Sequence, residues 1–131
     1  MDIDGKNHVL GRLATSTVEE LKKGKEVHIF NAEKVIVKGS PKQTVETYRQ
    51  KYNRGSRDHG PYFPKNPRKI VKRTIKGMLP NNKKGRNMLK NVKTYAKEPE
   101  GDAKVFQEAL EEDLRGSNFI TIKEISDQLG A

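Results

Sequence analysis

Positive charge is concentrated in one stretch of this chain of 131 residues, and this concentration limits how the chain can fold. Residues 48–97 contain sixteen Lys or Arg and a single acid, Asp58, which gives a net charge of +15. Residues 1–47 carry +1 and residues 98–131 carry −6, so the total is +10. A block of like charge repels itself unless a polyanion neutralises it. We therefore expect a basic surface that binds an anionic partner, with nucleic acid favoured over an anionic membrane surface or a merely solvated face.

Length and composition fit one small domain in a polar environment. The sequence predicts a single domain over residues 1–131, with a basic block at 48–97 and an acidic segment at 98–131. Hydrophobic residues make up 32% and charged residues 34%, and no cysteine is available for a disulfide or a thiolate metal site. We see no signal-peptide pattern and no apolar run near the roughly 20 residues of a membrane span. We expect a cytoplasmic protein with no membrane partner.

Hydrophobic periodicity predicts short strands that alternate with helices. Strands are expected around Ile3 and at residues 27–30, 35–37, 92–95 and 119–122. Helices are expected at residues 10–23, from Pro41 to about 52, at 67–79, at 81–89, from Asp102 to just before Gly116, and at 121–130. Strands and helices in this order indicate a layered α/β domain with a partly parallel sheet.

The predicted helix at residues 67–79 has one apolar and one basic half. At about 100° per residue, Ile70, Val71, Thr74, Ile75, Met78 and Leu79 share one half, and Lys69, Lys72, Arg73 and Lys76 share the other. The helix lacks the acidic partners that stabilise exposed helices by a few tenths of a kcal/mol per pair. Such a ridge suits phosphate contacts. Gly77 lies where the halves meet, either to let a sugar-phosphate backbone come close or as a tolerated small residue.

Residues 53–66 are predicted to form a long irregular loop. Together with the preceding helix, this segment interleaves basic residues with rings: Arg49, Lys51, Arg54, Arg57 and Lys65 with Tyr52, His59, Tyr62 and Phe63. Basic residues bind phosphate, and aromatic rings stack on unpaired bases for roughly 1–3 kcal/mol each. Tyr48 and Tyr52 lie on an apolar helical stripe, which favours core packing. For Tyr62 and Phe63, stacking and packing remain open.

The candidate nucleic-acid-binding residues come from these two segments, from Arg12 in the first helix and from the basic turn after Pro80. The full set is Arg12, Arg49, Lys51, Arg54, Arg57, His59, Tyr62, Phe63, Lys65, Arg68, Lys69, Lys72, Arg73, Lys76, Gly77, Lys83, Lys84, Arg86 and Lys90.

Motifs for enzymatic chemistry are missing from the sequence. His8, His28 and His59 lack ligand spacing to a partner, and no G-x-S-x-G motif occurs. The turn at Gly39 and Ser40 between a strand and a helix is typical of anion sites, but it lacks the P-loop pattern. We expect no catalytic residue, cofactor, metal or small-molecule substrate. A DNA-binding protein and a nucleotide-dependent enzyme that uses this turn are the alternatives.

Three segments resemble one known family. They read DIDGKNHVLGRLAT, IFNAEKVIVKGSP and GPYFPKNPRKIVKRTIKGMLPNNKKGRNMLKNVKTY. The family is the large-subunit ribosomal protein numbered thirteen, and the resemblance is to its archaeal branch. It covers about the first three quarters of the chain, while residues 98–117 match least well and inherit no role.

The resemblance implies both a fold and a function. The fold is a three-layer α/β/α arrangement around a four-stranded, mainly parallel sheet. The function is that of a structural constituent of the large ribosomal subunit. It binds and stabilises large-subunit ribosomal RNA during assembly and in the mature ribosome, without catalysis. The implied partners are this RNA and neighbouring large-subunit ribosomal proteins.

Overall fold

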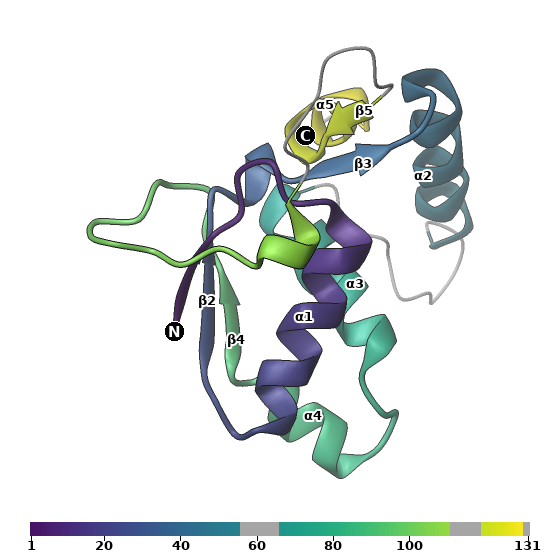
Figure 1. The fold of residues 1–131 in the computed structure, drawn as a ribbon. Helices are drawn as coiled ribbons and strands as arrows, with labels where there is room; N and C mark the ends of the chain where they lie inside the picture. The colour runs from purple at the N-terminus through teal and green to yellow at the C-terminus, as the bar shows by residue number, and fades with distance from the viewer. Residues whose placement is uncertain (56–65, 111–118, 130–131) are drawn as a thin grey trace.

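The computed structural model describes residues 1–55, 66–110 and 119–129, with only the backbone for residues 51–55. Its elements form a mixed α/β fold (Figure 1). In chain order they are β1 (Asp2–Asp4), α1 (Leu10–Lys22), β2 (Val27–Phe30), the 3₁₀ turn η1 (Ala32–Lys34), β3 (Ile36–Lys38), α2 (Pro41–Gly55), α3 (Pro67–Met78), α4 (Lys83–Leu89), β4 (Val92–Thr94), the 3₁₀ turn η2 (Gln107–Ala109), β5 (Phe119–Thr121) and α5 (Ile122–Gln128).

The strands form two sheets, where one was expected. A parallel sheet has the order β1-β2-β4, and β3 pairs with β5 in antiparallel fashion. The described residues therefore do not form a four-stranded sheet, although Lys104 makes one parallel bridge beside Ile3, where a fourth strand would lie. Asn31 turns the chain between β2 and β3, since it has a left-handed φ of 55° and its Nδ2 donates to Asp4 Oδ1 at 2.8 Å.

Helices α1 and α3 pack together against one face of the parallel sheet (Figure 1). Leu13 and Leu21 of α1, Ile70 and Ile75 of α3 and Ile29 of β2 are at most 2% exposed in this core. Burying one such side chain stabilises the fold by about 1.5–3 kcal/mol. Beside the other face, Figure 1 shows the loop that follows β4 and no helix. The described residues thus form two layers at this sheet, where three were expected.

The helix predicted from Asp102 is wrong over the described residues 102–110. The chain is extended at Lys104, which exchanges backbone hydrogen bonds with β1, and only the short turn η2 is helical. Val105, an apolar residue of this predicted helix, is 39% exposed. The Phe106 N–H donates to His8 Nε2 at 3.0 Å, so tertiary hydrogen bonds outweigh the local helical pattern. The remainder of that predicted helix lies outside the described residues.

The other predicted elements agree with the structure to within about three residues at their ends. Gly24 has the left-handed φ of 85° expected after the end of α1. Thr121 Oγ1 accepts from Glu124 N at 3.2 Å and caps the final helix at the start of its predicted range. Helix α2 runs to Gly55, so residues 53–55, predicted to open a loop, belong to this helix.

Candidate nucleic-acid interface

Helix α3 begins at a strong start signal and is anchored by its apolar half. Asn66 Oδ1 accepts a hydrogen bond from Arg68 N at 3.0 Å, and Pro67 occupies the first helical position. Ile70, Val71 and Ile75 are all 0% exposed. The buried half therefore fixes the direction in which the opposite half points.

The basic half of α3 points away from this core, as predicted. Lys69 and Lys76 are exposed, and Lys72 and Arg73 are half-buried. Met78 differs from the prediction, because it belongs to the apolar half but is 43% exposed. Its described hydrogen-bond neighbour on α1 is Thr15, an exposed residue whose Oγ1 lies 3.7 Å from Met78 Sδ. The last turn of α3 thus reaches only the solvent edge of α1.

A tight turn joins α3 to α4 and depends on a glycine that the sequence analysis did not single out. Pro80 follows the end of α3, and Asn82 Oδ1 accepts from Gly85 N at 2.9 Å to cap α4. Gly85 is buried, and a Cβ atom there would lie 1.8 Å from the Pro80 carbonyl oxygen. A glycine in a helix costs up to about 1 kcal/mol relative to alanine. Its presence despite this cost was the signal in the sequence that could have indicated a close backbone approach.

The turn leaves a groove of about 630 Å³ between α3 and α4. Its cationic lining residues are Arg73, Lys76 and Arg86. Gly77 also lines it, and a Cβ atom at this position would meet nothing within 4 Å. The structure therefore brings four candidate residues together around one hollow, and it leaves open space above Gly77.

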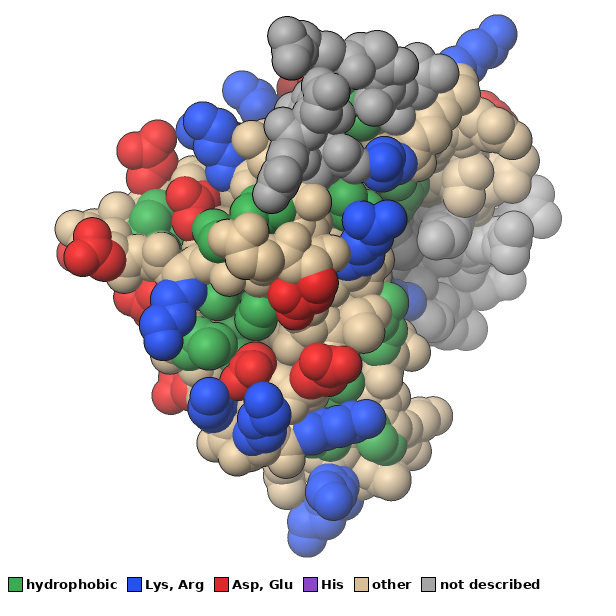
Figure 2. Space-filling view, in the orientation of Figure 1, with side chains coloured by type: hydrophobic (Ala, Val, Ile, Leu, Met, Phe, Trp, Pro, Cys, Tyr) green, Lys and Arg blue, Asp and Glu red, His purple; other side chains and the backbone are tan. Residues whose placement is uncertain are grey.

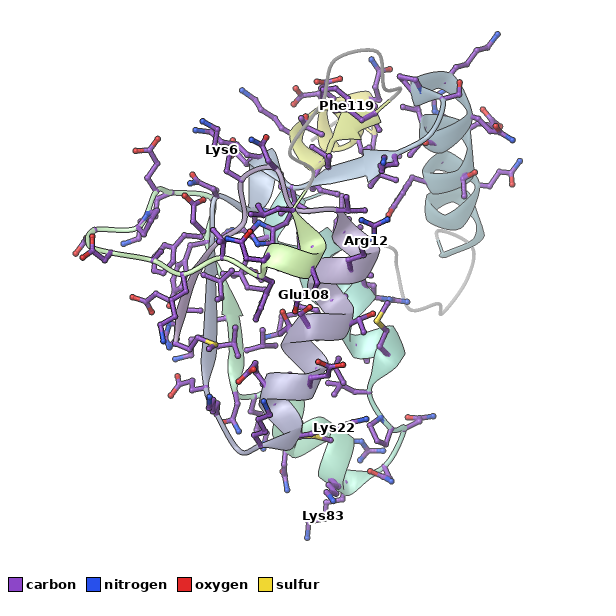
Figure 3. The ribbon with its side chains drawn as sticks, in the orientation of Figure 1. Lys6, Arg12, Lys22, Lys83, Glu108 and Phe119 are labelled. Carbon is purple, nitrogen blue, oxygen red and sulfur yellow. The ribbon has the colours of Figure 1, made fainter. Side chains whose placement is uncertain are left out.

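Nine candidate cations lie along α3, the turn and α4, and we refer to them as the α3–α4 basic surface. They are Arg68, Lys69, Lys72, Arg73, Lys76, Lys83, Lys84, Arg86 and Lys90. Figure 3 shows Lys83 at the outer end of α4, pointing away from the body of the protein. The sequence contains no Asp or Glu between residues 59 and 97, so no acid from these elements neutralises the surface.

Other faces of the protein mix the two signs of charge. On the face seen in Figure 2, Lys and Arg side chains lie among Asp and Glu side chains. Glu20 forms ion pairs with Lys23 and Lys25, at 3.4 and 3.1 Å. Lys34 pairs with Glu98 at 3.4 Å. The α3–α4 basic surface therefore differs in kind from the neighbouring surface.

Arg12 and Arg49 lie apart from the α3–α4 groove. Arg12 is exposed on α1 and lines a separate hollow with Glu19 and Glu108 (Figure 3). Arg49 is exposed on α2, and its Nη2 donates to the backbone oxygen of Gln128 at 3.4 Å. Arg49 has a local acceptor and Arg12 shares its hollow with two acids, which makes both weaker candidates for phosphate contact.

Several candidate residues cannot be placed. Tyr48 is 8% exposed, in agreement with the predicted core packing. The side chains of Lys51, Tyr52 and Arg54 lie outside the described part of the structure, as do the loop residues Arg57, His59, Tyr62, Phe63 and Lys65. Their proposed contacts stay predictions.

One buried histidine has a structural role. His8 is 0% exposed, its Nε2 accepts from Phe106 N at 3.0 Å, and its Nδ1 lies 3.2 Å from the Lys6 carbonyl oxygen. Burial lowers the pKa of His8 below its ordinary value of 6.5. The neutral ring that donates from Nδ1 satisfies both neighbours, so His8 joins the start of α1 to the segment before η2.

Among the residues that the structure describes, no three His, Asp or Glu side chains gather as a metal site would require. In the same part of the chain, no helix is both long and apolar enough to cross a membrane.

An α/β body that carries a basic surface on one side, on elements whose own sequence contains no acid, defines a class of protein that binds polyanions. The family described as Ribosomal protein L13 matches residues 1–101. The chain belongs to this family, whose members are structural ribosomal proteins and not enzymes. The family predicted from the three sequence segments is thereby confirmed.

Archaeal relatives match almost the whole chain. Large ribosomal subunit protein uL13 of Methanococcoides burtonii is 40% identical over 134 residues, which cover 98% of this chain and 96% of the relative. The protein of the same name from Sulfolobus acidocaldarius is 39% identical over 141 residues, with 98% and 91% covered. The one from Archaeoglobus fulgidus is 35% identical over 134 residues, with 98% and 86% covered.

Proposed function

We propose that this chain is a structural component of the large ribosomal subunit that binds and stabilises large-subunit ribosomal RNA. It acts during assembly and in the mature ribosome, and so supports translation. The observation that carries the proposal is the α3–α4 basic surface, whose nine cations have no acid nearby in sequence and stand on helices with buried apolar sides.

The mechanism is electrostatic contact from a rigid support. Ile70, Val71 and Ile75 hold α3 in the core, so the cations of its outer half keep a fixed spacing. Each cation that neutralises a phosphate releases condensed counterions, which drives binding. Phosphate contacts fix position and orientation on the RNA without reading its sequence. Folded RNA, which crowds phosphates together, is the partner that such a surface fits.

We assign a second contact to the last turns of α2 and the segment that follows it. Its basic and aromatic residues would reach into RNA junctions, where the rings stack on unpaired bases. Prolines in the segment reduce the entropy that is lost on binding. The residues concerned are Lys51, Arg54, Arg57, His59, Tyr62, Phe63 and Lys65.

Neighbouring large-subunit ribosomal proteins are the second class of partner that we propose. A hollow of about 480 Å³ between α2 and α5 is lined by the carboxylates of Glu46, Glu124 and Asp127, by the cations Lys42 and Arg49, and by the apolar side chains of Val45 and Ile120. This hollow suits a segment of a neighbouring protein that carries both charged and apolar side chains, because its lining mixes acids, bases and apolar residues, unlike the α3–α4 basic surface.

The salt dependence of binding tests the RNA proposal. We expect the affinity for archaeal large-subunit ribosomal RNA to fall with a log–log slope of about −4 to −5, if about six phosphates are contacted at roughly 0.7–0.9 each. Filter binding over a range of potassium chloride concentrations gives this slope. A slope near −1 would contradict the proposal, because it would leave a single phosphate contact.

Duplex DNA tests the main alternative. A DNA reader needs a helix that is free to enter the major groove, whereas α3 is buried along one half. We expect ribosomal RNA to bind more tightly than a DNA duplex of equal charge at the same salt concentration. Equal affinities would favour a general nucleic-acid-binding protein.

A further inference from the structure

The α3–α4 groove has a chemical composition that phosphate binding alone does not explain. Between the cations Arg73, Lys76 and Arg86, its lining includes the apolar side chains of Leu79, Pro80 and Leu89. A surface built only for phosphates needs cations on a ridge and no apolar hollow between them. The combination of apolar walls and a cationic rim fits a ligand with both a flat apolar part and a negative charge.

A nucleotide is such a ligand. Its base has apolar faces and hydrogen-bonding edges, and its phosphate is anionic. Unpaired bases in RNA are splayed out and packed against rings or guanidinium planes, and Arg73 and Arg86 both bring a guanidinium group to this groove. Asn81 adds an amide, which both donates and accepts, as the edge of a base requires. The volume of about 630 Å³ lies within the roughly 300–1,000 Å³ of small-ligand sites.

We propose that the α3–α4 groove receives one unpaired nucleotide, turned out of a helix or loop of the bound RNA. The base lies on the apolar lining, and Lys76 contacts the phosphate next to it. This inference rests on the proposed RNA binding and adds to it a contact with a single base. It differs from backbone contact at Gly77, because the space above that glycine is filled by the base.

The two glycines of the groove have different parts in this arrangement. Gly85 brings α4 close to Pro80, since any side chain there would collide with the Pro80 carbonyl, and this closeness forms the groove. Gly77 has nothing within 4 Å of a Cβ position, so it leaves the entrance open. A side chain at residue 77 therefore fills the groove without disturbing the fold.

Salt-dependent binding of Gly77→Leu to archaeal large-subunit ribosomal RNA tests the inference. Loss of a base contact lowers affinity by about tenfold but leaves the salt slope unchanged, because the slope counts phosphates. Asn81→Ala, at an exposed turn position, is expected to lower affinity about threefold to tenfold, again with an unchanged slope. Lys76→Gln should instead reduce the magnitude of the slope by about 0.7–0.9.

The matched control is Gly11→Leu, an exposed helical glycine on α1 that also has nothing within 4 Å of a Cβ position. It should bind the RNA as the unaltered protein does, and thermal unfolding should show that both leucine variants are folded. An unchanged affinity of Gly77→Leu, a reduced slope in that variant, or an equal loss in Gly11→Leu would overturn the inference. If the unaltered protein itself binds with a slope near −1, the proposed function fails, which is a separate result.

Discussion

Helices α1 and α3 pack against each other and bury similar apolar faces, but they treat charge in opposite ways. On α1, Glu20 pairs with Lys23 and with Lys25 just beyond the helix end. On α3, the outer half carries only cations, and no acid follows in sequence until Glu98. Both helices have fully buried apolar side chains in the core, so apolar burial does not require the arrangement of charge on α3.

The difference separates two uses of a charged surface. Exposed ion pairs such as those of α1 contribute a few tenths of a kcal/mol and neutralise the surface locally. An outer half with cations alone gives up this contribution and accepts repulsion. The repulsion among these cations is relieved only when an external polyanion supplies negative charge. The comparison therefore identifies α3 as the partner-facing helix more directly than net charge does.

The largest expected effect comes from removing charge on α3. Replacing Lys69, Lys72 and Lys76 with Gln should lower the affinity for large-subunit ribosomal RNA by about 100-fold at 0.15 M salt, at roughly fivefold for each phosphate contact. Replacing the paired residues Lys23, Lys25 and Lys34 removes equal charge but should change the affinity less than about threefold. Similar losses in the two triple variants would abolish the distinction between the helices.

The second effect concerns how the basic surface is shaped. Gly85→Ala places a Cβ atom 1.8 Å from the Pro80 carbonyl oxygen, so the backbone must shift, at a cost of about 1–3 kcal/mol in the free energy of unfolding. Gly77→Ala meets nothing and should stabilise α3 by up to about 1 kcal/mol. Urea unfolding measures both, and a Gly85→Ala protein as stable as the unaltered one would contradict the described turn.

The third effect is a dependence of the free energy of unfolding on pH, and it arises on the α1 side of the molecule. The pKa of His8 is lowered by burial, so the unfolded chain binds a proton that the folded chain refuses. The stabilisation is complete above the unfolded value of about 6.5 and decreases as the pH falls below it. Urea unfolding at about pH 7.5 and about pH 5, on either side of the unfolded pKa, should show this decrease in the free energy of unfolding. His8→Asn should reduce it, whereas Lys76→Gln should leave it unchanged.

The smallest effect should come from the ion pairs of α1. Glu20→Gln removes the carboxylate that pairs with both Lys23 and Lys25 and should destabilise the protein by about 0.2–1 kcal/mol, without weakening RNA binding. Glu19→Gln is the control, because Glu19 is exposed on the same helix and no ion pair is described for it. A clear loss of RNA affinity in Glu20→Gln would place α1 at the interface as well.

Local signals in the sequence were sufficient for the parts of the fold that depend on local interactions. The cap at Asn66, the left-handed Gly24 and the apolar periodicity of α1 and α3 all act within a few residues. The same periodicity placed four cations on the outer half of α3, and these four belong to the candidate interface.

The prediction failed where distant segments compete with local preference. Residues 102–110 have a helical pattern, but β1 supplies backbone partners to Lys104 and His8 accepts from Phe106. The chain is therefore extended at Lys104, and only the turn η2 is helical. Met78 shares the apolar half of α3, yet α1 does not cover it. The role of Gly85 depends on the close approach of Pro80, which lies before the turn, and no periodicity reveals this approach.

The bridge between Ile3 and Lys104 has a consequence for folding during synthesis. β1 is made before the other described strands, but its outer neighbour is made about a hundred residues later. At roughly 5–20 residues per second, this edge waits about 5–20 s for its partner. The pairing of β1 is therefore completed late, and a nascent chain exposes an unpaired strand edge to chaperones or to other nascent chains during that interval.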